Sequence, residues 1–171
     1  MIRKVLMLIV LCASAMTMQA QKFALVDMDY ILKNIPAYER ANEQLAQVSK
    51  KWQAEVDVLQ TEAQTMYKDY QKEVVFLSQE QKKARQDAIM EKEREAAELK
   101  KKYFGPEGEL FKKRTALMSP IQEEIYTAVS EIADLRGYQL VLDRASDAGI
   151  IFASPKVDIS SEVLSRLGYS N

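Results

Sequence analysis

Apolar side chains recur every three or four positions along the first half of a long, charged stretch of this chain. The stripe consists of Ala41, Leu45, Val48, Trp52, Val56, Leu59, Ala63, Met66, Tyr70, Val74 and Leu77. It covers 36 residues in ten steps, an average of 3.6, so these side chains fall on one side of an α-helix. A stripe of this period needs little supercoiling, and it predicts a long, nearly straight helix whose apolar side is covered by a partner.

The partner is expected to be the second half of the same stretch. Strand-like runs flank the region at residues 22–27 and 137–143. If these runs pair, the chain between them must leave and return, and its turn must lie near the midpoint. Close to that point Ser78 and Gln81 have the spacing of a capping box at the start of a new helix. We therefore expect an antiparallel helical hairpin with its tip at residues 76–79.

Further along the chain, Gly105, Pro106 and Gly108 form a sequence that disfavours a continuous helix. A turn there would give arms of very unequal length, so these residues are interpreted as a hinge within the returning arm of a limb over residues 36–119. If the chain folds back at residues 76–79, residues 105–108 come close to Trp52. We expect the two glycines to make room for the indole ring.

The segments on either side of the limb predict a small β-rich body made of residues 21–35 and 120–171. Short strands are expected at residues 22–27, 138–143 and 150–153, which makes the fold α+β and mostly α. Three short strands with apolar edges form too small a core to carry the limb, so several chains should associate through the body. The candidate association residues are Phe23, Leu25, Leu140, Leu142 and Ile151.

Helix signals in the body predict where its helices begin and end. Asp29 is expected to cap a short helix, Ser119 to cap a helix with Pro120 at its first position, and Asp158 to cap a closing helix. Gly137 should end the preceding helix. The buried faces are expected to be Ile121, Ile125, Ala128, Ile132 and Leu135 on one helix, and Ile159, Val163 and Leu167 on the other.

Residues 1–20 have the pattern of a signal peptide. Arg3 and Lys4 precede an apolar run that is too short for a membrane-spanning helix, and Ala20 offers a cleavage site. Cleavage would remove Cys12, the sole cysteine. It would also remove two basic residues. The full sequence has 24 basic and 25 acidic residues, so the cleaved chain would have 22 basic and 25 acidic residues and a net charge of −3. An exported chain of this charge is expected neither to bind nucleic acid nor to insert stably into a membrane.

The residue types exclude most catalytic sites. The chain has no histidine, and its cysteine lies in the expected signal peptide, so a Ser-His dyad, a thiolate nucleophile and an ordinary zinc site are ruled out. Asp27 and Asp143 end two strands that can be neighbours, and capping or turn roles are favoured over metal binding. We therefore expect neither an enzyme nor a bound cofactor. The basic run Lys82, Lys83 and Arg85 is interpreted as a solvated helix face, with a basic tip for an acidic partner as the alternative.

Blocks at both ends of the chain resemble a known family. They are Lys22–Met28 (KFALVDM), Ile125–Val129 (IYTAV), Gln139–Asp143 (QLVLD), and Val157–Ile159 followed by Val163 and Leu164. With the hairpin between them, the chain resembles the OmpH-like, or Skp, family of periplasmic chaperones. The resemblance implies a jellyfish-shaped homotrimer with a β-rich body and three helical tentacles around a cavity. It also implies that the cavity holds unfolded outer-membrane proteins without ATP.

Three apolar residues on the descending helix, Val58, Val75 and Phe76, lie too far from the stripe to reach the hairpin seam. Two of them are at the tip, beside the charged and weakly packed residues 80–102. For a chaperone of this kind, we expect these three residues to contact the unfolded client. The alternative is a structural coiled coil that spaces or tethers other periplasmic proteins.

Overall fold

The computed structural model describes residues 22–146 and 149–169. The expected signal peptide, residues 1–20, lies outside the described residues. The chain divides into two compact units. One contains the described residues up to Asn34 and those from Ile125 onward, and the other is Ile35–Glu124.

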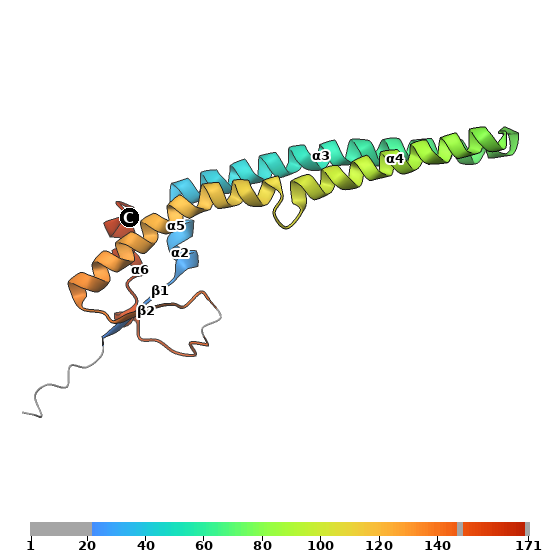
Figure 1. Cartoon of the computed structure of the whole chain (residues 1–171). Helices are drawn as coiled ribbons and strands as arrows, with labels where there is room; N and C mark the ends of the chain where they lie inside the picture. The colour runs from blue at the N-terminus through green and yellow to red at the C-terminus, as the bar shows by residue number, and fades with distance from the viewer. Residues whose placement is uncertain (1–21, 147–148, 170–171) are drawn as a thin grey trace, which may run out of the picture. The chain divides into compact units, whose positions relative to one another are not determined.

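Unit Ile35–Glu124 is built from antiparallel helices. Helix α3 (Pro36–Glu73) leads through the short 3₁₀ turn η2 (Val74–Phe76) into α4 (Gln79–Phe104), and α5 (Glu109–Arg136) begins after a break. Figure 1 shows α4 side by side with the later part of α3. The expected helical hairpin is therefore present.

The start of α4 confirms the predicted capping box. The backbone N–H of Gln81 donates to Ser78 Oγ at 3.2 Å, and the backbone N–H of Ser78 donates to Gln81 Oε1 at 2.9 Å. Two N–H groups at the helix start are thereby satisfied by side chains. This local chemistry starts the returning helix next to the 3₁₀ turn.

The apolar stripe forms the seam of the hairpin, as predicted. All eleven stripe residues are buried or half-buried, with Ala41, Leu45, Val56 and Ala63 the most enclosed on α3. On α4 the buried residues are Ile89 and Ala96. Small side chains at several of these positions let the two helices approach each other closely.

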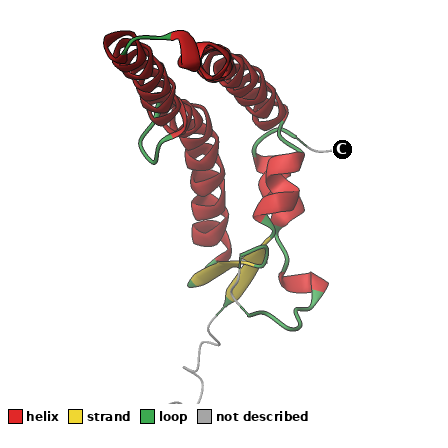
Figure 2. Ribbon diagram, turned by 90° about the vertical axis from the view of Figure 1, so that its right-hand side faces the viewer, coloured by secondary structure: helices red, strands yellow, loops and turns green. Residues whose placement is uncertain are grey.

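The other unit contains a two-stranded parallel sheet. Strand β1 (Phe23–Val26) pairs with β2 (Leu140–Asp143), with Phe23 opposite Leu140 and Val26 opposite Asp143. Figure 2 shows the two strands next to each other. The unit also contains α2 (Met28–Lys33), the end of α5, the 3₁₀ turn η3 (Pro155–Val157) and α6 (Ser160–Arg166). Its buried apolar residues are Ala24, Leu25, Val26, Ile31, Ile125, Ala128, Ile132, Ile159, Val163 and Leu164.

The prediction of a strand at residues 150–153 is wrong. The description of this unit as β-rich is wrong for the same reason. Residues 150–153 are irregular, and Ile151 and Phe152 are exposed. On the free side of β1, Leu25 instead forms a single bridge with Asp158, and the N–H of Ile159 donates to the Leu25 carbonyl at 2.9 Å. The side of β1 away from β2 is thus used by the start of α6.

Three expectations about α5 have different outcomes. Pro120 lies inside the helix rather than at its first position, on the exposed side, with buried Ile121 and Ile125 following it. An interior proline costs about 3 kcal/mol, and burial of these two isoleucines offsets that cost. Leu135 was expected to be buried and is 80% exposed. Gly137, with φ at 70°, ends the helix as predicted, and the next N–H, of Tyr138, donates back to Ala133.

The caps of the two short helices also differ from the expectation. Asp27, not Asp29, is the N-cap of α2, because extended backbone at Asp27 lets its carboxylate accept the N–H of Tyr30 at 2.8 Å. The N-cap position of α6 is Ile159, while the Asp158 carboxylate accepts the N–H of Ser160 at 2.9 Å. In both helices an aspartate satisfies an otherwise unpaired N–H.

Candidate functional site

The predicted client-contact residues are exposed on the helical hairpin. Val58 on α3 is 57% exposed, while Val75 and Phe76 in η2 are 77% and 85% exposed. The 3₁₀ turn at the chain reversal buries neither Val75 nor Phe76. These three side chains lie outside the filled seam, as the helical geometry predicted.

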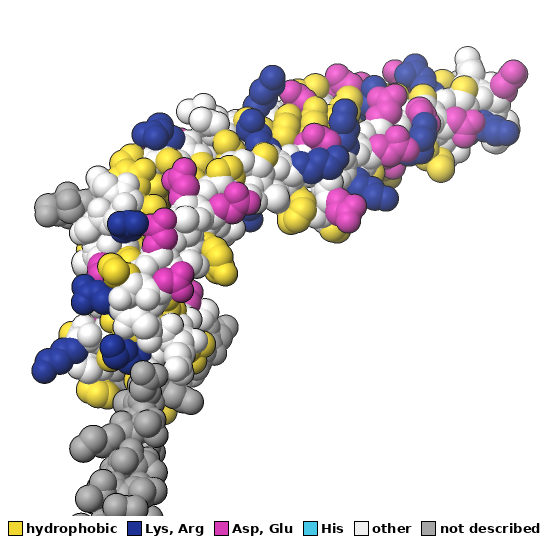
Figure 3. Space-filling view, turned by 60° about the vertical axis from the view of Figure 1, so that its left-hand side comes forward, with side chains coloured by type: hydrophobic (Ala, Val, Ile, Leu, Met, Phe, Trp, Pro, Cys, Tyr) yellow, Lys and Arg dark blue, Asp and Glu magenta, His cyan; other side chains and the backbone are white. Residues whose placement is uncertain are grey.

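Ion pairs between basic and acidic side chains lie on the same hairpin as these apolar residues. Arg94 pairs with Glu91 and Glu98 along α4, which raises the pKa of the Arg94 guanidinium. Lys92 lies between Glu95 on its own helix and Glu62 on α3. Figure 3 shows basic and acidic side chains interspersed with hydrophobic ones. Exposed pairs of this kind add little stability, but they keep the surface hydrated and without a strong net charge.

Three further exposed apolar residues on the hairpin were missed by the sequence analysis. They are Tyr67 on α3, Met90 on α4 and Phe111 on α5. Each stands next to a residue that is buried or half-buried, namely Met66, Ile89 and Leu110. The 3.6-residue period of the returning arm is the signal that places Met90 beside the buried Ile89 and off the seam.

The predicted hinge residues form the break between α4 and α5. The N–H of Gly105 donates to Lys101 at 2.8 Å, the N–H of Gly108 donates to Gly105 at 2.9 Å, and the N–H of Lys112 donates to Gly108 at 3.1 Å. Pro106 is exposed within this compact turn.

The expected reason for the two glycines is wrong. A Cβ atom on Gly108 would lie 2.8 Å from the Tyr103 carbonyl oxygen and 2.9 Å from the Gly105 nitrogen, and one on Gly105 would meet the Lys101 carbonyl oxygen. The absence of a side chain at Gly105 and Gly108 therefore lets neighbouring backbone atoms approach closely. The indole of Trp52 instead stacks on the ring of Tyr103, with centroids 4.8 Å apart.

The candidate association residues differ in how much surface they offer. Phe23, Leu140 and Leu142 are exposed, and Ile151 is fully exposed. Leu25 is 3% exposed, so it belongs to the core of its own chain and offers no surface to a partner. The sequence analysis missed Phe152 and Leu135, two further exposed apolar side chains of this unit.

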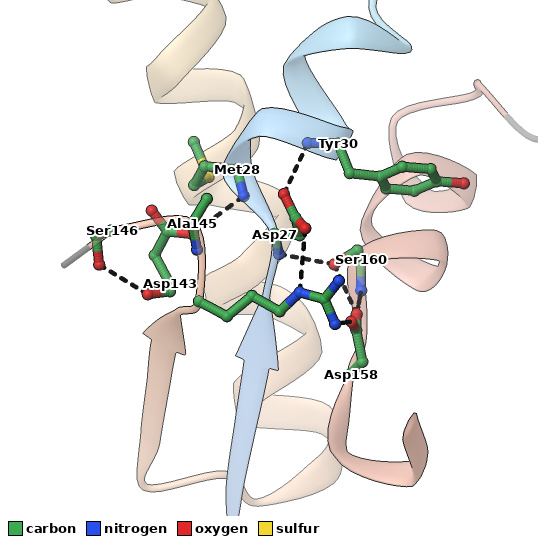
Figure 4. A network of polar contacts seen from close by, with 9 residues as sticks. Asp27, Met28, Tyr30, Asp143, Ala145, Ser146, Asp158 and Ser160 are labelled. Carbon is green, nitrogen blue, oxygen red and sulfur yellow. Dashed lines mark hydrogen bonds and ion pairs between the residues drawn. The ribbon is translucent and has the colours of Figure 1, made fainter. Parts of the chain in front are cut away.

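A ring of polar contacts joins three distant segments of the same unit (Figure 4). Arg144 donates to Asp27 Oδ2 at 3.0 Å and to Asp158 Oδ2 at 3.1 Å. The hydroxyl of Ser160 donates to Asp158 Oδ1 at 2.6 Å and accepts the N–H of Asp27 at 2.8 Å. The N–H of Tyr30, and after it Arg144, hold the pKa of Asp27 below its usual value.

The two aspartates at the strand ends have structural roles, as predicted. Asp27 caps α2, and Asp143 accepts the N–H groups of Met28 at 3.1 Å and Ala145 at 2.9 Å. Within residues 22–146 and 149–169, no group of three or more acidic, histidine or cysteine side chains is placed to hold a metal ion. The carboxylates are engaged in turns and caps.

Comparison with known proteins identifies the family. The model of the family described as outer membrane protein (OmpH-like) matches residues 22–167. The chain belongs to this family. The chaperone protein Skp of Yersinia enterocolitica is 26% identical over 157 residues, which is 91% of each chain.

A solved structure has the same fold. An OmpH-like protein from Caulobacter crescentus CB15, described as a candidate outer membrane chaperone, matches with a TM-score of 0.66 at 14% identity. The match covers 85% of this chain and 82% of the other. Neither relative is described as an enzyme. Among the described helices of the present chain, none is long and apolar enough to cross a membrane.

Proposed function

We propose that this OmpH-like chain is an ATP-independent periplasmic chaperone that holds unfolded outer-membrane β-barrel proteins and prevents their aggregation. Support comes from the family match over residues 22–167 and from the relative of known name, a chaperone aligned along 91% of its length. In this proposal residues 1–20 direct export, and three chains associate so that their limbs surround a cavity.

The observation that carries the proposal is the surface of the helical hairpin. Its seam is filled by its own stripe, yet Val58, Val75 and Phe76 remain exposed on a hairpin that also carries ion pairs. A single exposed apolar side chain needs no explanation. Several weak apolar contacts spread over a hydrated surface suit a client with no fixed structure, because none of them imposes a conformation.

The remaining surfaces have separate roles in this proposal. Association of chains is assigned to Phe23, Leu140, Leu142 and Ile151, with Leu25 forming the core beneath them. Bending of the limb is assigned to the break at residues 105–108. No cofactor takes part, because holding an unfolded chain requires contacts and no chemical step.

Suppression of aggregation tests the proposal. An unfolded outer-membrane β-barrel protein is diluted from urea into buffer without ATP, and light scattering is followed with and without this protein. We expect scattering to fall to near the buffer baseline at one trimer per client. An unrelated coiled-coil protein of similar mass is the control. If the chain suppresses no more scattering than this control, it is a spacer or tether and not a chaperone.

A further inference from the structure

The last turn of α4 is fixed to α3 by aromatic contacts. The rings of Trp52 and Tyr103 are stacked with an angle of 6° between their planes and 4.8 Å between their centroids. The phenol of Tyr103 donates to Glu55 Oε2 at 2.5 Å, a short hydrogen bond to a carboxylate. Phe104 packs edge-on against the Tyr103 ring at 6.4 Å. We call Trp52, Glu55 and Tyr103 the clasp.

The clasp differs from the other polar side-chain contacts that join α3 and α4 within the described residues. Those contacts are the pairs Lys92–Glu62, Gln86–Tyr70 and Arg85–Glu73, at 3.5, 3.0 and 3.4 Å, each with at least one exposed partner. Exposed polar pairs can re-form after a small shift, whereas a ring stack with a directed hydrogen bond is lost if one ring slides by a few ångströms. Together with the apolar packing of the seam, the clasp therefore fixes how α4 is positioned lengthwise on α3.

The break that follows the clasp can change its length. Residues 105–108 are outside both helices, with Pro106 and Glu107 exposed. On the other arm, α3 is one unbroken helix from Pro36 to Glu73. The two arms at this level thus differ, because one is a continuous helix and the other contains a short non-helical segment.

Bending a pair of helices requires one to slide along the other. Packed helix axes lie about 10 Å apart, so a bend of roughly 20° changes their relative length by about 3 Å. A continuous helix can supply that length only by breaking several of its regular hydrogen bonds, whereas residues 105–108 would lose the one bond from the Gly108 N–H to the Gly105 carbonyl. Sliding by about 3 Å would also separate the rings of Trp52 and Tyr103.

We infer that the clasp is a lock on bending of the limb: while Tyr103 is stacked on Trp52 and bonded to Glu55, residues 105–108 cannot extend. When the clasp opens, the break takes up the change in length and the hairpin bends about α3. This inference goes beyond the proposed function and does not depend on any client.

A distance measurement across the break tests the lock. Spin labels are attached at Asp87→Cys on α4 and Thr115→Cys on α5, both exposed positions, with Cys12 replaced by serine wherever it is retained. Labelled chains are mixed with excess unlabelled chains so that label pairs between chains are rare. Pulsed electron paramagnetic resonance then gives the distribution of distances within one limb.

We expect a narrow distribution in the parent chain and a broader one, with its mean shifted by about 3 Å, in Tyr103→Leu. Tyr103→Phe keeps the stack and loses the hydrogen bond, so it should broaden the distribution to a smaller extent. Tyr67→Leu is the matched control, because it removes a half-exposed tyrosine of α3 outside the clasp, and it should change nothing.

Two results would overturn the inference. One is a parent distribution as broad as that of Tyr103→Leu. The other is an unchanged, narrow distribution in Tyr103→Leu with helix content preserved by circular dichroism. If Tyr103→Leu loses helix content, Tyr103→Phe decides: broadening supports the lock, and an unchanged width refutes it.

Discussion

At the scale of the residue, Asp27 shows how one side chain can connect distant parts of the sequence. Its carboxylate caps α2 through Tyr30 and pairs with Arg144, while its own N–H donates to Ser160. The partners come from the start of the chain, the end of β2 and the start of α6. Ser160 is buried, so this polar contact sits at the edge of the apolar core.

Replacing Asp27 with asparagine should lower stability in a pH-dependent way. Asparagine keeps the cap but loses the charge that pairs with Arg144, which is worth about 1 kcal/mol or less at an exposed site. Because the pKa of Asp27 is lowered in the folded chain, this stability is present above about pH 4 and is lost as the pH falls through the folded pKa. Thermal unfolding followed by circular dichroism should therefore separate the two proteins at pH 7 and bring them together near pH 2.

The control for this comparison is Asp29→Asn, which removes an exposed acidic side chain in the first turn of the same helix. It should leave the difference between pH 7 and pH 2 close to that of the parent chain. If Asp27→Asn were less stable than the parent chain by the same amount at pH 7 and at pH 2, the carboxylate charge would contribute nothing to stability. The lower stability of the variant would then come from packing.

At the scale of the element, the helical hairpin separates residues that stabilise it from residues that are free to bind. The stripe from Ala41 to Leu77 is packed in the seam, and the capping box at Ser78 sets where the returning helix α4 begins. Exposed apolar residues such as Val75 and Phe76 contribute little to that packing. Binding and folding can therefore be altered independently.

Changing Val58, Val75 and Phe76 together to serine should weaken client binding and leave the hairpin intact. All three side chains are exposed, so the melting temperature should stay within about 2 °C of the parent value, as expected for surface changes. Suppression of β-barrel aggregation should require several-fold more protein. Light scattering and thermal unfolding on the same preparation measure both quantities.

A matched control places serine at three exposed polar positions of α3, Gln60, Gln64 and Gln71. This control should suppress aggregation as well as the parent chain does. If the Val58, Val75 and Phe76 variant is equally effective, these residues are ordinary surface. Tyr67, Met90 and Phe111 would then be the next residues to change.

At the scale of the whole molecule, the two units differ in how completely a single chain can bury its apolar residues. The hairpin covers its own stripe. The unit with the sheet leaves Phe23, Leu140, Leu142, Ile151 and Phe152 exposed beside a sheet of two four-residue strands. A sheet this small with an apolar surface is stabilised when another chain covers it. This is the physical basis for the proposed association.

Leu140→Asp combined with Leu142→Asp should give monomers or unfolded chains, because two charges would be buried in the proposed interface. Sedimentation velocity at micromolar concentration measures the mass, and circular dichroism reports folding. Ile151→Asp serves as a second variant, since this fully exposed side chain can change without affecting the fold of one chain. It should weaken association while helix content is kept. A parent protein that sediments as a folded monomer would contradict the proposed trimer.

The sequence by itself determined the features that depend on neighbours within a few positions. The stripe, the capping box of Ser78 and Gln81, and the helix end at Gly137 follow from helix period, side-chain hydrogen bonds and backbone conformation. Each of these is fixed by energies that act within one or two turns of a helix. The exposure of Val58, Val75 and Phe76 follows from the same periodicity.

Other features were decided by the tertiary structure. Whether residues 150–153 pair, which aspartate caps α2, and what lies against Trp52 depend on segments that are far apart in sequence. A β-branched run becomes a strand when a strand edge is available, and the edge of β1 is used at Leu25 by the start of α6. The indole meets Tyr103 because the hairpin brings α4 back alongside α3. Such contacts arise from close packing between elements, which no pattern along a single element contains.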